Sequence, residues 1–277
     1  MRKLLSANGR YLIKNRLFWI EILFCIVFSG WIMFANYSPE IQASAEPIHL
    51  ESPFFIMYQI LSIVFASAIS LIVGTEYSDG TLRNKLIIGH TRTEIYFSIL
   101  VSMLVTSLLA IVAHGIVSYG IGYFLFGAFQ ISAGELACAI LCAIFANFVF
   151  TTLFVAIALN CSNKSISVVV SILSSIVIIV VSNIARSKLL EPETTYDGIV
   201  ITANGVEFGN IIQNPNYVTG MARKLYEGLY NILPTGQLMQ IQSLEFSHWP
   251  YWLLASIVLC VVLTFVGYLL FRKKDIN

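Results

Sequence analysis

Residues 54–74 read FFIMYQILSIVFASAISLIVG and contain no charged side chain. A run of this length matches the roughly 20 apolar residues that an α-helix needs to cross the hydrocarbon of a bilayer. The charged stretch TEYSDGTLRNKL follows at once, at positions 75–86. We therefore predict a membrane-spanning helix that ends in a polar segment outside the bilayer.

Five further apolar runs have the same character, so the fold class expected is all-α integral membrane, with six transmembrane helices in a single transmembrane domain over 1–277. The predicted spans are 17–36, 54–74, 94–119, 134–159, 166–184 and 249–271. In the third run, apolar character continues past Tyr119 to Phe129 with glycines at intervals. This pattern favours one long helix with a loosened outer end over two separate spans.

The composition supports a membrane protein. Apolar residues make up 57% of the chain and charged residues only 11%, whereas a soluble domain typically carries about 25% charged residues. The mean hydropathy is +0.81, which leaves too few polar residues for a separate soluble catalytic domain. The formal net charge of +1 gives no basic surplus of the kind that binds nucleic acid.

The basic residues are distributed unevenly between the two sides that six spans create. If both termini are cytoplasmic, twelve Lys and Arg residues lie in inner segments and four in outer segments, and an inner excess is the usual pattern. The inner residues are Arg2, Lys3, Arg10, Lys14, Arg16, Arg83, Lys85, Arg92, Lys164, Arg272, Lys273 and Lys274. The outer residues are Arg186, Lys188, Arg223 and Lys224. We therefore predict cytoplasmic termini.

Two inner segments have amphipathic patterns. Residues 1–16 alternate leucine and tyrosine with basic side chains, which predicts an interfacial helix on the inner leaflet, with a solvated basic tail as the alternative. In the loop 75–93, Leu82, Leu86 and Ile87 are expected on one helical face between two glycines. We predict a short cytoplasmic helix there, with a solvated loop as the alternative.

The block 185–248 is the largest polar segment and is predicted to be extracellular. Residues 199–202 and 206–208 flank Ala203-Asn204-Gly205, a pattern typical of a β-hairpin with an Asn-Gly turn. Apolar residues then recur at helical spacing from Val218 to Leu233, and Thr235 can cap a second short helix after Pro234. Such apolar faces are expected to pack over the span ends or to dip into the bilayer.

A few polar side chains fall inside the predicted spans. Small residues recur four apart, including Ser62 and Ser70 on the second span and Ser167, Ser171 and Ser175 on the fifth. Close helix packing explains these serines, and a polar pathway lining is the functional alternative.

Two ionisable side chains also lie within the predicted spans. Glu21 is expected to pair with a nearby base such as Arg16, although a buried carboxylate also raises the hypothesis of a function. His114 is predicted to be a hydrogen-bonded packing histidine.

Several chemical motifs are missing from the sequence. It contains no P-loop, no H-E-x-x-H or G-x-S-x-G motif, and no group of His, Cys or carboxylate residues at metal-ligand spacing. We therefore expect neither an enzyme nor a metal or cofactor site in this chain. The pattern favours a six-span channel-forming or gating protein.

The stretch Gly74-Thr75-Glu76-Tyr77-Ser78-Asp79-Gly80-Thr81-Leu82-Arg83-Asn84-Lys85-Leu86, followed by Gly89 and Arg92, resembles the loop after the second span in ABC-2 type permeases of bacterial ABC exporters. The six-span plan, the basic N-terminus and the two short outer helices are similar too. The resemblance implies a coupling helix that rests on a separate P-loop ABC ATPase subunit, which would bind ATP and Mg. It assigns coupling to Glu76, Asp79, Gly80, Leu82, Arg83, Leu86 and Arg92.

The resemblance also implies a homo- or heterodimer of permeases in the bacterial cytoplasmic membrane. Its outer helices would form an extracellular gate that contains Leu225, Leu229, Leu233, Pro234 and Leu238. The apolar, serine-dotted interior favours export of an amphipathic or hydrophobic cargo such as a peptide, an antimicrobial or a drug. The alternative function is a non-transporting immunity or sensor protein that binds a peptide through its extracellular block.

Overall fold

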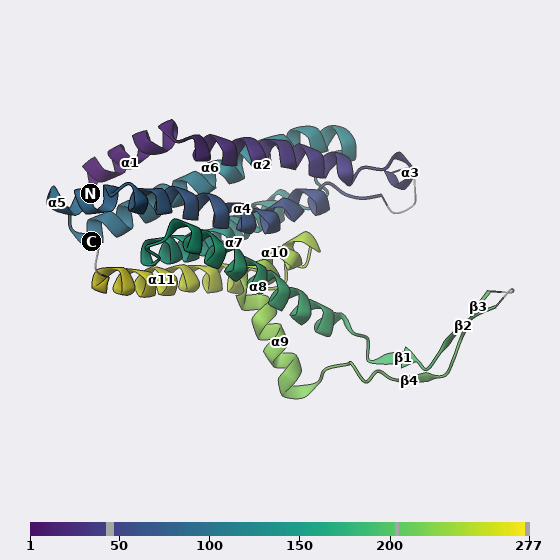
Figure 1. The fold of residues 1–277 in the computed structure, drawn as a ribbon. Coiled ribbons are helices and arrows are strands. Elements are labelled where there is room, and N and C mark those ends of the chain that lie inside the picture. Colours follow the sequence, from purple (N-terminus) through teal and green to yellow (C-terminus); the bar gives the residue numbers. More distant parts are fainter. Residues whose placement is uncertain (43–46, 203–204, 275–277) are drawn as a thin grey trace.

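The structure is a computed structural model that describes residues 1–42, 47–202 and 205–274 (Figure 1). Within these residues, six helices are long and apolar enough to cross a membrane. They are α2 (Arg16–Ala35), α4 (Glu51–Ser78), α6 (Arg92–Phe126), α7 (Ala133–Asn160), α8 (Lys164–Leu190) and α11 (Trp249–Lys273). The prediction of an all-α protein with six spans is confirmed, and by helix length and hydropathy the chain is a multi-pass membrane protein.

Most of these helices are longer than the apolar runs that predicted them. The third span is one helix of 35 residues, as expected, and it ends at Gly127, whose φ of 85° is a backbone conformation suited to glycine. At about 1.5 Å per residue this helix is roughly 52 Å long, well beyond the hydrocarbon thickness of ~30 Å. Its first turn is polar and is fixed by a capping box between Thr91 and Glu94.

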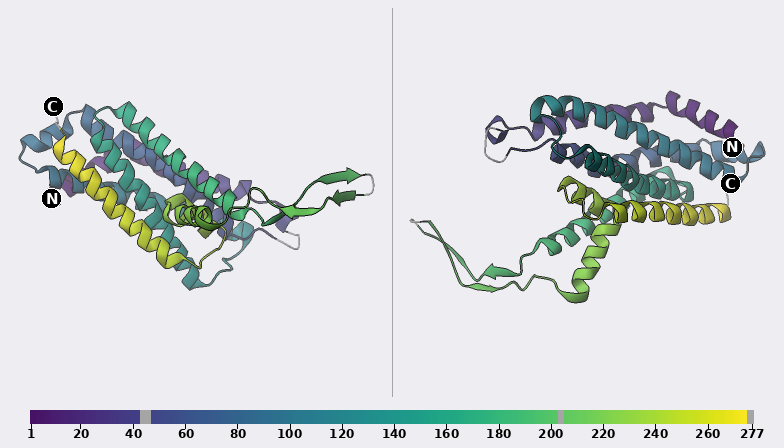
Figure 2. Two further views of the ribbon diagram at one scale, coloured as in Figure 1. Left: turned by 90° about the horizontal axis from the view of Figure 1, so that it is seen from below. Right: turned by 180° about the vertical axis from the view of Figure 1, so that it is seen from behind.

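Helix α4 lies at the centre of the bundle and packs against α2, α6, α7, α8 and the short helix α10 (Pro234–Gln242) (Figures 1 and 2). Helices α2 and α6 lie on one side of α4, and α7 and α8 on the other, with α11 packed on α7. The core contains fully buried large side chains such as Phe65, Phe150 and Phe154. Few residues of α8 and α11 are buried within the single chain.

The polar segment before the last span contains two antiparallel strand pairs, which form an arm that projects from the helices (Figures 1 and 2). Strand β2 (Ile199–Thr202) pairs with β3 (Gly205–Phe208), which confirms the predicted hairpin. The predicted turn residues Ala203 and Asn204 lie outside the described residues. An unpredicted pair, β1 (Thr194–Tyr196) with β4 (Ile211–Gln213), continues the arm toward the bundle.

Helix α9 (Gly220–Ile232) leads into α10, where all side chains from Pro234 to Ile241 are buried. The predicted cap at Thr235 is wrong. The extended backbone of Leu233 forms the N-cap and Pro234 occupies the first turn, so the helix begins before Thr235. The Thr235 hydroxyl has no hydrogen-bond partner in the part of the chain that the structure describes.

Two further short helices lie outside the spans. Helix α1 (Arg2–Lys14) buries Leu4, Asn8 and Leu12 and packs on α6, so the predicted amphipathic helix is present. Helix α3 (Pro39–Gln42) follows the first span at the opposite end of the bundle.

Candidate functional site

Helix α5 (Thr81–Ile87) stands beyond the bundle at the end where α1 begins and α11 ends (Figure 1). Gly80 precedes it with a φ of 68°, a left-handed conformation that reverses the chain direction after α4 at little steric cost. Gly89 has a φ of 98° and ends the segment before α6. The predicted helix in the loop 75–93 is therefore present.

Helix α5 is tied to the bundle through Lys85. Its Nζ atom lies 2.7 Å from Oε2 of Glu76 and donates to Oδ1 of Asn8 at 3.1 Å. Asn8 in turn donates to the hydroxyl of Ser98 at 3.3 Å. Helices α1, α4, α5 and α6 thus share one polar network. Glu76, which the resemblance assigned to coupling, forms its ion pair with Lys85 of the same chain.

The apolar residues of α5 point in two directions. Leu82 is 1% exposed and belongs to the core, and Leu86 packs against that core. Ile87 and the following Ile88 are 72% and 77% exposed. The expectation that Ile87 shares a face with Leu82 and Leu86 is wrong, because successive helical residues are separated by about 100°.

The exposed residues of this segment include Asp79, Arg83, Ile87 and Ile88, and we call the surface that these four form the α5 tip. Charged and aliphatic side chains stand side by side on it.

Arg92 fixes the other end of the loop to the last span. Its guanidinium donates to the backbone carbonyls of Phe271 at 3.1 Å and Arg272 at 3.2 Å, and also to that of Lys274. These are carbonyl groups at the C-terminal end of a helix, where a cation is favourable. Arg92, assigned to coupling by the resemblance, thereby joins the exit of the loop to α11.

Lys274 belongs to the same cluster. Its ammonium lies 4.2 Å from the centre of the Tyr77 ring and donates to the Leu159 carbonyl at 3.2 Å. Partial burial lowers the pKa of Lys274 from its ordinary value. The Tyr77 hydroxyl donates to the same carbonyl at 2.8 Å, so the ends of α4, α7 and α11 are held together.

At the opposite end of the bundle, the predicted gate residues do not share one face. Leu225 is 62% exposed, Leu229 packs beside Tyr230, and Leu238 is fully buried. Leu233 and Pro234 form the joint between α9 and α10. Burial raises the pKa of Tyr230 to about 12.

Sequence reasoning missed the polar contacts that hold α10 in place. Gln237 donates to the carbonyls of Asn231 and Ile232 at 3.0 and 3.2 Å, and its Oε1 accepts from Ser256 at 2.8 Å. Gln240 donates to the Tyr230 carbonyl at 3.2 Å. The signal available in the sequence was the spacing of Gln237 and Gln240, which lie three residues apart and therefore on one side of the helix.

Residues 23–277 match a protein-family model described as Protein of unknown function (DUF2705). The chain belongs to the DUF2705 family. The match covers all six spans except the first residues of α2. The comparison with curated proteins found no match.

In this DUF2705 chain, the serines predicted to recur on the second and fifth spans lie between α4 and α8 and are fully buried. Ser70 donates to Ser171 at 2.8 Å, and Ser175 donates to Ser62 at 3.0 Å. Among the described residues, the Ser167 hydroxyl has no hydrogen-bond partner. These contacts agree with close helix packing, and the pathway-lining role stays a prediction.

His114 of the DUF2705 chain is a hydrogen-bonded packing residue, as predicted. Its Nδ1 lies 2.9 Å from the Ser29 hydroxyl and 3.0 Å from that of Ser118, and its Nε2 lies 3.2 Å from the Phe54 carbonyl. Since only a ring N–H can satisfy the carbonyl, Nε2 is the donor and Nδ1 the acceptor.

The predicted pairing of Glu21 with a nearby base is wrong. Glu21 is 3% exposed, and neither carboxylate oxygen has a hydrogen-bond partner within the described residues. Five residues separate it from Arg16, a spacing that rotates the two side chains about 140° apart around the helix. Glu21 instead lines a cavity between α2 and α4.

Proposed function

We propose that this chain is the transmembrane subunit of an ATP-driven ABC exporter, and that the α5 tip docks a separate ATPase. The observation that carries the proposal is the exposure of Ile87 and Ile88 on a short helix that is itself fixed to the bundle. Exposed isoleucines beside Arg83 offer an apolar anchor with a charged rim, which suits a protein partner. In this proposal ATP and Mg bind the partner, and this chain has no ATPase activity of its own.

The internal contacts of the loop support a mechanical role. The Lys85–Glu76 ion pair joins α5 to α4, and Arg92 joins the start of α6 to the end of α11. A displacement of α5 would therefore move three spans together rather than bend a loose turn. Two such chains, identical or related, would move relative to each other in the bacterial cytoplasmic membrane, with their termini on the ATPase side.

The cargo that fits best is an amphipathic or hydrophobic molecule such as a peptide, an antimicrobial or a drug. The spans contain few ionisable side chains, so a strongly charged cargo would find little compensation inside the bilayer. The joint of α9 and α10 would act as the outer gate, with Leu229 and Leu233 as its apolar seal.

Docking can be tested by photo-cross-linking in membranes of the source cells. A benzoylphenylalanine at Ile88 should form an adduct that an azido-ATP label marks as a nucleotide-binding protein. The same residue at Ile116, an exposed position on α6, should give no such adduct. The double variant Ile87→Asp/Ile88→Asp should lose the adduct formed from a cross-linker at Arg83. The proposal is contradicted if the cross-linker at Ile88 gives no ATP-labelled adduct. It is also contradicted if the adduct from the cross-linker at Arg83 still forms in the double variant.

A second candidate is a non-transporting immunity or sensor protein that binds a peptide. It is favoured by the projecting strand arm and by a polar cavity of about 500 Å³ between α8, α9 and α10. Arg186, Arg223, Glu227 and Glu245 line this cavity and could contact both ends of a peptide. Protection against a peptide that persists in the Ile87→Asp/Ile88→Asp variant favours this candidate over transport.

A further inference from the structure

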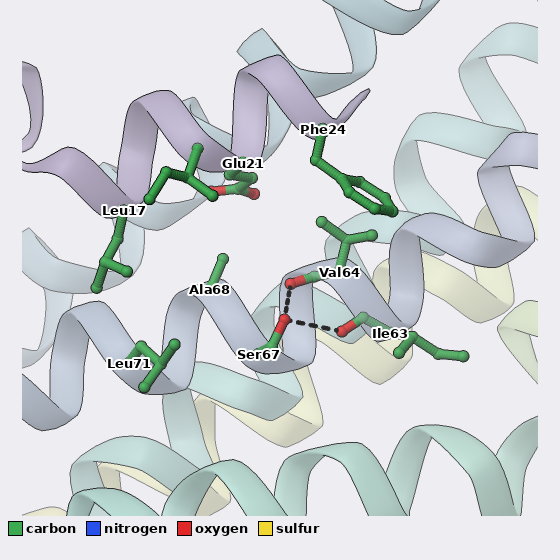
Figure 3. A pocket seen from close by; sticks show the side chains of 9 residues that line it. Leu17, Glu21, Phe24, Ile63, Val64, Ser67, Ala68 and Leu71 are labelled. Atoms are coloured by element: carbon green, nitrogen blue, oxygen red, sulfur yellow. Dashed lines mark hydrogen bonds between the residues drawn. The ribbon is translucent and has the colours of Figure 1, made fainter. Parts of the chain in front are cut away.

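A cavity of about 280 Å³ lies between α2 and α4, within the span region and away from the α5 tip (Figure 3). Its walls are aliphatic and aromatic, and Leu17, Phe24, Val64 and Ala68 face it from the two helices. The volume is near the lower end of the roughly 300–1,000 Å³ range of small-molecule sites. The cavity therefore suits a small ligand.

Two polar side chains, Glu21 and Ser67, line this cavity, and of these two only Ser67 forms hydrogen bonds among the described residues. The Ser67 hydroxyl bonds to the carbonyls of its own helix, at 2.8 Å from Val64 and 3.3 Å from Ile63 (Figure 3). The Glu21 carboxyl group has no hydrogen bond or ion pair within the described part of the chain. Glu21 is thus the wall side chain whose hydrogen-bonding capacity is entirely unused among the described residues.

Glu21 is buried within a membrane-spanning helix, where an unpaired carboxyl group matters most. It lies five residues into α2, about 7.5 Å along the helix axis from Arg16, and is 3% exposed. An unpaired carboxylate in such an apolar setting is strongly disfavoured, so the group is either neutral or matched by a cation. The adjoining cavity leaves room for a cation that carries its own apolar body.

The exposed residues in its lining indicate that the cavity opens on the outer surface of the bundle. Ile20, Phe24 and Ile63 border it and are 59%, 42% and 39% exposed. Because these residues lie in membrane-spanning helices, a ligand would enter from the bilayer. A strongly hydrated inorganic cation is a poor fit, since it needs several oxygen ligands where this site supplies one carboxyl group.

We propose that this cavity binds a small lipophilic monocation, such as an aryl-alkyl amine or quaternary ammonium, with Glu21 as its counter-ion. The ammonium head would sit against the carboxylate and near the Phe24 ring, whose face favours cations. The apolar body would fill the space between α2 and α4. The site stands on this chain alone, so it does not depend on the docking of an ATPase.

The test compares benzyltrimethylammonium with neopentylbenzene, its uncharged carbon isostere, by equilibrium dialysis. The full chain is used in nanodiscs of zwitterionic lipid, and binding to empty nanodiscs is subtracted. Wild-type protein should bind the cation at least about tenfold more tightly than the isostere, a difference of roughly 1.4 kcal/mol. Glu21→Gln should abolish this preference while the isostere binds as before.

Two further variants separate the site from non-specific effects. Ala68→Leu fills the cavity with Glu21 unchanged and should weaken the binding of both probes. Ser67→Ala removes a hydroxyl that is already bonded to its own helix, so binding should stay unchanged. Equal binding of the cation by wild-type and Glu21→Gln protein, or by wild-type and Ala68→Leu protein, would overturn the proposal.

A measurement on wild-type protein alone tests the site without relying on the correct folding of any variant. Dicyclohexylcarbodiimide modifies carboxyl groups in apolar surroundings, and mass spectrometry locates the product. Benzyltrimethylammonium should slow modification of Glu21 at concentrations where neopentylbenzene has a smaller effect. Equal protection by the two probes would show that the carboxyl group does not act as a counter-ion.

Discussion

The Nζ atom of Lys85 lies 2.7 Å from Oε2 of Glu76, and the two side chains are 12% and 8% exposed. The ion pair joins the short helix α5 to the end of α4 across the turn at Gly80. Because the pair is largely shielded from water, it is screened less by salt than a surface pair would be. The orientation of α5 is therefore set within this chain before any partner binds.

Removal of one partner of this pair should destabilise the protein more than removal of both. Lys85→Met leaves the Glu76 carboxylate buried without its cation, which should cost about 3 kcal/mol of unfolding free energy. The double variant Glu76→Gln/Lys85→Met should recover much of that loss. SDS denaturation in mixed micelles gives both values, and additive effects of the two substitutions would argue against the pairing.

The two sides of α5 should respond differently to a charge. Leu82→Asp places a carboxylate in the core and should lower the thermal stability of the purified chain markedly. Ile87→Asp and Ile88→Asp alter exposed side chains and should leave stability within about 0.5 kcal/mol of wild type. Circular dichroism melts in detergent compare them. A stable Leu82→Asp protein would mean that α5 is oriented differently.

Glycine packing between α7 and α11 provides a matched pair of variants. A Cβ atom at Gly267 would lie 2.6 Å from Cβ of Ala156 and 2.5 Å from the Tyr96 hydroxyl. Gly267→Ala should therefore separate the two helices and cost about 1–3 kcal/mol. A Cβ atom at Gly120 meets nothing within 4 Å, so Gly120→Ala should be neutral or stabilising by up to ~1 kcal/mol. Denaturation midpoints that fall in the reverse order would contradict the α7–α11 packing.

The charge asymmetry of the sequence predicts which end of the bundle faces the cytoplasm. In a chain without native cysteines, Glu193→Cys should react with an impermeant thiol reagent in intact cells, because it lies on the exposed arm. Asn84→Cys, on α5, should react only after the cells are opened. Labelling of Asn84→Cys from outside would reverse the orientation and leave the α5 tip unable to reach a cytoplasmic ATPase.

The gate proposal predicts an ion leak. Leu229→Ser/Leu233→Ser weakens the apolar joint between α9 and α10, so proteoliposomes should lose their ion gradient faster than with wild type. Leu225→Ser serves as the matched control because Leu225 is mostly exposed. A double variant that is less stable but remains tight would make this joint a structural cap.

The existence of the spans could be predicted because hydropathy depends on local composition alone. The residues at which the helices begin and end could not be predicted in this way. The first turn of α6 is polar, and its capping box becomes visible as a helix start only when Thr91 and Glu94 are recognised together. The α5 segment was located correctly, but its inward face depends on contacts with the core at Leu82. No local pattern in a seven-residue helix specifies those contacts.

The wrong prediction for Glu21 and the missed polar contacts of α10 both have a tertiary origin. A carboxyl group near Arg16 in sequence was expected to pair with it, but helical rotation directs Glu21 toward α4. In α10, Gln237 and Gln240 are typical of a solvent-exposed helix until their bonds to Asn231, Tyr230 and Ser256 are known. A single sequence shows which polar groups exist but not which distant groups satisfy them.

The buried position of α10 has a consequence for the order of biosynthesis. With nine residues it is far too short to cross a bilayer by itself, so it would leave the insertion machinery on the polar side. Its Gln237 is satisfied partly by Ser256, a residue of α11 that is synthesised later. We therefore expect α10 to settle among α4, α7 and α8 only after the last span is in place, as a late step of assembly.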